Sequence, residues 1–95
     1  MITNIAVVSI FVTDQEKAGE FWLEKAGFKV VYEEPMGPDG SWIELELPDG
    51  GARLVLYPKQ YMRDSDRMRP SIMFECDDIH GTYERMKAGG VEFLY

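Results

Sequence analysis

Residues 5–12, IAVVSIFV, open a pattern that occurs twice in this chain of 95 residues and decides its fold. The first copy continues with Thr13-Asp14, then a helical segment that ends in Lys25-Ala26-Gly27, then the run FKVVY (28–32). The second copy has the same order: SIMFEC (71–76), Asp77-Asp78, a helical segment that ends in Lys87-Ala88-Gly89, and GVEF (90–93). A duplicated unit of this kind completes its hydrophobic core against its twin. The repeat therefore predicts two modules packed in one domain.

The first copy begins with a strand that leads into a helix. Residues 5–12 are rich in β-branched and aromatic types without clean alternation, which predicts a central strand covered on both faces. Thr13 followed by Glu16 has the spacing of a capping box, so a helix should begin there. Residues at spacings of three and four form the apolar stripe that should pack on a sheet: Ala18, Phe21, Trp22 and Ala26.

The segment between the two copies has the pattern of strands. Residues 29–33, 42–47 and 53–57 are predicted strands, separated by turn formers at 35–40 and 48–51. The element order is therefore βαβββ in an α+β protein. The predicted division is a first module of residues 1–58, a connection of residues 59–70 and an incomplete second module of residues 71–95.

The second module lacks counterparts of the strands at 42–47 and 53–57. Their absence would leave an unpaired sheet edge, and proteins normally cover or pair such edges. We therefore expect either residues beyond Tyr95 or another chain to fill the gap.

Composition and charge exclude several classes of function. The net charge of −7, from 17 acidic and 10 basic residues, opposes binding to nucleic acid or anionic lipid. The single cysteine, Cys76, excludes an internal disulfide, and its place in the strand pattern predicts a small buried hydrophobe. No apolar run is long enough for a membrane span and the N-terminus does not resemble a secretion signal. We expect a cytoplasmic protein.

Three segments carry a resemblance to a known superfamily. They are Phe11-Val12-Thr13-Asp14, the helix exit from Phe21-Trp22 to Gly27-Phe28, and Phe74-Glu75-Cys76-Asp77-Asp78. With the repeated βαβββ pattern, they resemble the vicinal oxygen chelate superfamily of glyoxalase I, extradiol dioxygenases and bleomycin resistance proteins, in particular its glyoxalase-like members. The resemblance implies paired modules that form a curled mixed sheet around a cavity, commonly in a homodimer.

The resemblance also implies where a divalent metal would bind. Metal-binding members carry His or Glu ligands on cavity-facing strands, and the first three ligand positions correspond here to Val7, to the vicinity of Val55 and to that of Ser71. A hydrocarbon has no lone pair, and serine is a poor ligand for a tight transition-metal site. We therefore expect no metal and no other cofactor. The single histidine, His80, lies at the start of the second helix, and we expect its side chain to lie in solvent or at the helix cap and not in the cavity.

Strand alternation then predicts which side chains line the cavity. If Val55 faces it, so do the residues two positions away on the same strand, and the same reasoning applies to the other strands. The predicted pocket consists of Val7, Ser9, Trp42, Glu44, Glu46, Arg53, Val55, Tyr57, Ser71, Met73 and Glu75. Leu54 and Leu56 should face the helices instead.

The charged pocket residues have two interpretations. Glu44, Glu46 and Glu75 could supply a general base or hard-metal ligands if two of them converged, or they could simply be solvated. Arg53 could bind a ligand carboxylate, or pair across the sheet with Glu44 or Glu46. Asp14, Asp77 and Asp78 are predicted helix-start residues.

The sequence is compatible with three functions. The first is binding of a small organic molecule in the sheet cavity, without the usual metal site. The second is a metal-dependent glyoxalase- or dioxygenase-type enzyme with rearranged carboxylate ligands, and the third is a dimerisation module only. No particular catalytic residue is predicted.

Overall fold

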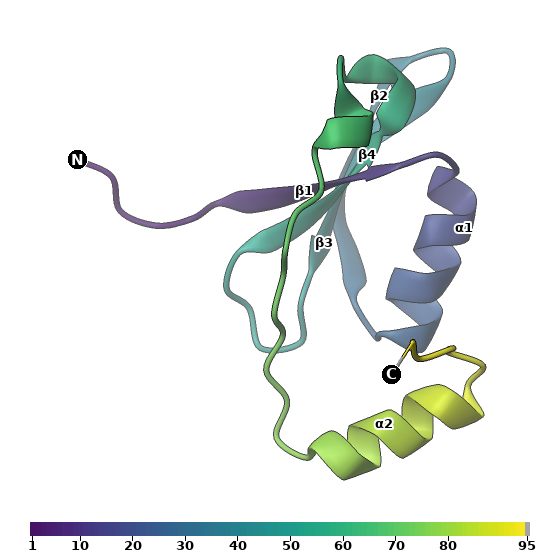
Figure 1. The fold of residues 1–95 in the computed structure, drawn as a ribbon. Helices are drawn as coiled ribbons and strands as arrows, with labels where there is room; N and C mark the ends of the chain where they lie inside the picture. The colour runs from purple at the N-terminus through teal and green to yellow at the C-terminus, as the bar shows by residue number, and fades with distance from the viewer. Residues whose placement is uncertain (95) are drawn as a thin grey trace.

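The computed structural model describes residues 1–94 and has one four-stranded sheet with helical segments beside it (Figure 1). The elements in chain order are β1 (Val7–Val12), α1 (Gln15–Gly19), the π-helix η1 (Glu20–Lys25), β2 (Lys29–Gly37), β3 (Gly40–Glu46), β4 (Arg53–Pro58), the 3₁₀ turns η2 (Lys59–Tyr61) and η3 (Ser65–Arg67), and α2 (Ile79–Ala88). The α+β class and the βαβββ order of the first module are confirmed.

The sheet is mixed, with the strand order β1-β4-β3-β2. Strand β1 runs parallel to β4, whereas β3 is antiparallel to both β4 and β2. The prediction of a central strand was wrong, because β1 lies at the edge of the described sheet. Its apolar composition comes from contacts on both faces: Ile10 packs toward the helix, whereas the Phe11 ring contacts Tyr57 on the other face.

The hydrophobic core lies between the sheet and the helical segment that begins at Gln15. Its centre is formed by Leu45, Leu54 and Leu56, which are almost completely buried. Complete burial of one leucine side chain stabilises the fold by about 1.5–3 kcal/mol. The partly buried side chains packed around them are Val8, Ile10, Val12, Ala18, Trp22, Leu23, Phe28, Ile43 and Ile72. The predicted orientation of Leu54 and Leu56 toward the helix is confirmed.

The first helix begins one residue later than the capping-box prediction. Asp14 is the N-cap, and its Oδ1 accepts hydrogen bonds from the backbone N–H groups of Glu16 at 3.0 Å and Lys17 at 3.1 Å. A carboxylate satisfies these free amides and interacts favourably with the positive end of the helix, so it displaces Thr13 from this role. Asp14 is confirmed as a helix-start residue, and the Thr13–Glu16 capping box is not formed.

The helix widens into a π-helix from Glu20 to Lys25. In a π turn the bonded residues are five apart instead of four, as in the bond from Ala26 N–H to the Phe21 carbonyl at 2.9 Å. Leu23, five residues after Ala18, therefore joins Ala18 in the core. A stripe predicted from ordinary helical spacing omits Leu23 for this reason.

The side chain of Gln15 ties the start of α1 to the sheet. Its Nε2 donates to the Leu56 carbonyl at 2.8 Å and to the Ser41 carbonyl at 2.5 Å, and its Oε1 accepts from Ser41 N–H at 3.0 Å. One partly buried amide thus bridges β3, β4 and the helix. This bridge fixes the helix over the face formed by Leu54 and Leu56.

The second module has its helix but none of its strands within residues 1–94. Residues 71–76 and 90–93 do not belong to any sheet, which corrects the two predicted strands. A strand forms only when a neighbour satisfies its backbone groups, and no described segment pairs with either run. Because the strand is absent, Cys76 is exposed instead of buried. The division into two modules stays a prediction.

The helix of the second module begins as predicted. The Asp78 Oδ1 accepts from Gly81 N–H at 3.0 Å at the N-terminus of α2. His80 is exposed in the first turn. No helix among residues 1–94 has the length and apolar character needed to cross a membrane.

We predict that Gln15→Ala destabilises the protein by about 1–3 kcal/mol, because it leaves partly buried Ser41 and Leu56 backbone groups without their partner. The measurement is urea unfolding followed by circular dichroism. The control is Lys17→Ala, an exposed residue of the same helix, which should change stability by less than about 0.5 kcal/mol. Equal losses in the two variants would show that Gln15 has no special role.

Candidate functional site

One face of the sheet carries eight of the eleven side chains predicted to line a pocket. We call it the open face; it is opposite the face on which Leu45, Leu54 and Leu56 pack against the helix. The eight are Val7 and Ser9 on β1, Arg53, Val55 and Tyr57 on β4, and Trp42, Glu44 and Glu46 on β3. Sequence alternation was sufficient to place them together.

Three aromatic rings form a row across the open face. The Phe11 and Tyr57 ring centroids are 5.7 Å apart with an interplanar angle of 82°, and those of Tyr57 and Trp42 are 6.0 Å apart at 86°. Edge-to-face contacts of this kind are favourable and hold each ring in place. The row therefore offers a preformed apolar surface from β1 to β3. Phe11 was missed in the predicted pocket, although the alternation of Val7 and Ser9 leads directly to it.

A carboxylate held by two donors lies beside this row. The Trp42 indole Nε1 donates to Glu44 Oε2 at 3.0 Å, and Arg53 Nη1 donates to Glu44 Oε1 at 3.4 Å. The Glu44 side chain is only 15% exposed, whereas that of Arg53 is 49% exposed. Of the two interpretations of Arg53, the structure contains the cross-strand ion pair. Both oxygens of Glu44 are engaged within the face, whereas the half-exposed guanidinium of Arg53 is accessible from solvent.

Two residues of β2 extend the open face. Tyr32 pairs in register with Glu44, and Glu34 pairs with Trp42. The Tyr32 hydroxyl donates to Glu34 Oε2, and this hydrogen bond, reinforced by the negative charges of Glu34 and Glu44, raises the pKa of Tyr32 above its ordinary value. A register shift between Val30 and Tyr32 reverses the alternation of β2, so strict counting by two along the sequence would assign these residues to the wrong face.

The remaining three predicted pocket residues are not part of the sheet. Ser71, Met73 and Glu75 are exposed in the segment that connects η3 to α2, and Met73 is 94% exposed. The alternate residues Ile72 and Phe74 pack on the helix side, against the core cluster and the Trp22 and Phe28 rings respectively. The prediction that this segment continues the pocket fails because residues 71–76 do not form a strand.

The residues present do not fit the metal site that the resemblance implies. Val7 and Val55 lie on neighbouring strands of the open face but offer no donor atoms, and Ser71 lies outside the sheet. Among residues 1–94, no three His, Cys, Asp or Glu side chains are grouped so that they could hold a metal ion. Glu44, Glu46 and Glu75 therefore do not assemble into a replacement.

The sequence profile of the Glyoxalase/Bleomycin resistance protein/Dioxygenase superfamily matches residues 4–95. The chain belongs to this superfamily. It is 52% identical over 94 residues to the protein YetH of Bacillus subtilis, a match that covers 99% of this chain and 78% of YetH.

Two solved structures are also similar to this chain in fold. A Glyoxalase/bleomycin resistance protein/dioxygenase superfamily member from Sphaerobacter thermophilus has a TM-score of 0.84 and 24% identity, covering 99% of this chain and 77% of that one. TnmS3, an antibiotic binding protein from Streptomyces sp. CB03234, has a TM-score of 0.79 and 27% identity, covering 96% of this chain and 74% of TnmS3. The four-stranded mixed sheet of this chain thus has the fold of the matched parts of these two structures.

We predict that Glu34→Gln lowers the pKa of Tyr32 toward the ordinary tyrosine value, because the charged acceptor of its hydroxyl is removed. The measurement is an NMR titration of the tyrosine Cζ signals. In the original protein the raised pKa means that Tyr32 holds its hydroxyl proton more tightly in the folded state than in the unfolded state. The hydrogen bond of the protonated Tyr32 therefore stabilises the fold below the unfolded-state pKa, and this stabilisation is lost as the pH rises through the folded-state pKa. Glu33→Gln is the control, and an equal shift in both variants would contradict the assignment.

Proposed function

We propose that the protein binds a small organic molecule on the open face and does not transform it. The observation that carries this proposal is the row of Phe11, Tyr57 and Trp42 beside the Glu44–Arg53 pair. Fixed aromatic rings provide a large contact area at small entropic cost, and a few polar groups beside them orient a ligand. The half-exposed guanidinium of Arg53 is available as a donor to such a ligand.

Similarity to TnmS3 supports binding as the function. That protein is an antibiotic binding protein, and it is 27% identical to this chain in a match that covers 96% of this chain. The open face of this chain has no metal-ligating side chain at Val7 or Val55, and Glu44 uses both carboxylate oxygens within the sheet. A carboxylate with both oxygens engaged is a poor general base and a poor metal ligand. Binding of a small molecule without reaction therefore agrees better with these open-face residues than metal-assisted catalysis does.

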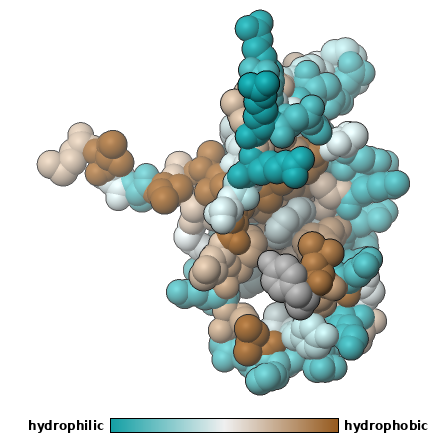
Figure 2. Space-filling view, viewed as in Figure 1, coloured by the Kyte–Doolittle hydropathy of each residue, from teal (hydrophilic) through white to brown (hydrophobic). Residues whose placement is uncertain are grey.

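We further propose that the binding unit is a cytoplasmic homodimer. Large apolar side chains stay exposed in the single chain, among them Met73, Ile79 at 69% and Ile5 at 69%. Figure 2 shows hydrophobic side chains along the projecting N-terminal segment, where Met1 and Ile2 are fully accessible. Exposed apolar surface of this kind is typical of an interaction site. Sedimentation velocity should give the mass of two chains.

We predict that a ligand of the open face perturbs the Trp42 indole signal and that Tyr57→Ala weakens its binding about tenfold, the effect of losing one aromatic contact. The probes are metal-free bleomycin and a panel of aromatic antibiotics, titrated into ¹⁵N-labelled protein. Tyr83→Ala, a change in α2 away from the open face, should leave the affinity unaltered. The proposal is contradicted if no compound shifts the Trp42 signal, or if both tyrosine variants bind equally well.

We predict that protein purified without chelator contains far less than one metal ion per chain, as measured by plasma mass spectrometry. The reason is that Val7 and Val55 supply no lone pairs at the usual ligand positions. The control is the same measurement on Glu44→Gln. Stoichiometric Fe, Mn, Ni or Zn that is lost in this variant would contradict metal-free binding and favour the enzyme alternative.

A further inference from the structure

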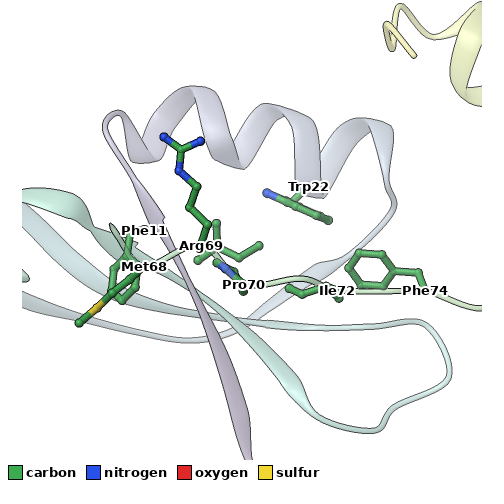
Figure 3. A pocket seen from close by; sticks show the side chains of 8 residues that line it. Phe11, Trp22, Met68, Arg69, Pro70, Ile72 and Phe74 are labelled. Atoms are coloured by element: carbon green, nitrogen blue, oxygen red, sulfur yellow. The ribbon is translucent and has the colours of Figure 1, made fainter. Parts of the chain in front are cut away.

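A cavity lies beside the edge strand β1, mainly on the helix side of the sheet. It has a volume of about 370 Å³, is open to solvent on one side and is lined by the edge strand β1, Trp22 of the π-helix η1 and residues of the segment 68–74 (Figure 3). Apolar side chains line most of it, and among the described lining residues Arg69 alone is ionisable. Cavities that bind small molecules start at about 300 Å³, so this one is large enough for a molecule of one or two fused rings.

The aromatic wall of this cavity is fixed by its own packing. Trp22 contacts three rings, with centroid separations of 4.9 Å to Phe21, 5.3 Å to Phe28 and 5.8 Å to Phe74. It also belongs to the π-helix η1, and π-helical turns are uncommon and frequently occur at functional sites. The indole ring is therefore a preorganised stacking surface.

Arg69 supplies a positive charge at the same cavity. Figure 3 shows its side chain extending toward α1, on the same side of the connecting segment as the Trp22 ring. The ion pairs within residues 1–94 are Arg53–Glu44 and Lys59–Asp66, so no carboxylate of that range lies within 4.0 Å of the Arg69 guanidinium. The positive charge of Arg69 contributes to lowering the pKa of Asp66, but the Asp66 carboxylate is paired with Lys59. The Arg69 donors are free to bind a ligand.

We propose that this cavity binds a small aromatic carboxylate, with its ring against Trp22 and Phe74 and its carboxylate on Arg69. The planar guanidinium matches the geometry of a carboxylate, and the apolar lining provides contact area for the ring. This site lies beside the edge strand β1 and meets the open face at Phe11, but it uses Trp22 and Arg69 where the open face uses Trp42 and Arg53. It adds a second ligand class to the protein and does not depend on the function proposed for the open face.

The two tryptophans of the chain allow the two sites to be observed separately. Trp22 lines the cavity and Trp42 lies on the open face, so each indole N–H signal in a ¹H–¹⁵N spectrum monitors one site; Trp42→Phe assigns them. The probe is 2-naphthoate, and its neutral analogue is 2-naphthalenemethanol. We predict a saturable shift of the Trp22 signal with 2-naphthoate, at least about tenfold weaker binding of the alcohol, and binding that weakens as salt is raised.

Arg69→Gln should weaken 2-naphthoate binding about tenfold, because one charge-assisted pair is removed. Arg67 is an exposed arginine in the same connection, and it does not line the cavity. The Arg67→Gln variant should therefore bind 2-naphthoate as tightly as the original protein. Arg69→Lys should retain part of the affinity. Dispersed spectra of all variants establish that they are folded.

Three results would overturn the proposal: no saturable Trp22 shift at millimolar 2-naphthoate, equal binding of the neutral alcohol, or equal affinity in Arg69→Gln and Arg67→Gln. Each of these leaves the proposed function intact, since that function is measured at Trp42.

Discussion

Strand β4 is buried from both faces, and the rest of the structure depends on its alternation. Leu54 and Leu56 face the helix, whereas Val55, fully buried between its neighbours Ser9 and Glu44, faces the other way with Arg53 and Tyr57. A shift of one residue in its register would move two leucines to the open face and the arginine into the core. The same constraint therefore maintains the hydrophobic core and places the functional side chains together.

Much of the first module follows from periodicity, because periodicity is a local property. Alternation in residues 42–47 and 53–57 correctly separated core side chains such as Leu45 and Leu54 from the aromatic and charged ones. Prediction failed where geometry departs from the regular period. The register shift in β2 concealed Tyr32 and Glu34, and the π-helix placed Leu23 in the core outside the expected stripe.

The second module shows a different limit of sequence-based prediction. Residues 71–76 have the composition of a strand, yet a strand also requires a partner, which no local pattern specifies. No segment of residues 1–94 pairs with this run; Ile72 and Phe74 pack on the helix side, and the predicted pocket residues Ser71, Met73 and Glu75 stay outside the site. The cavity lined by Trp22 and Arg69 arises from this packing, so no motif in the sequence indicated it.

The parallel pairing of β1 with β4 also has a consequence for how the chain is made. Strands β2, β3 and β4 join consecutive neighbours through short turns, whereas β1 pairs with a strand more than forty residues later, as in the register of Val8 with Leu54. During synthesis β1 emerges first but has no partner until Pro58 has left the ribosome. Its apolar residues must stay unpaired through that interval, and pairing over such a separation is intrinsically slow. The segment that begins the fold is thus the last part of the first module's sheet to be completed.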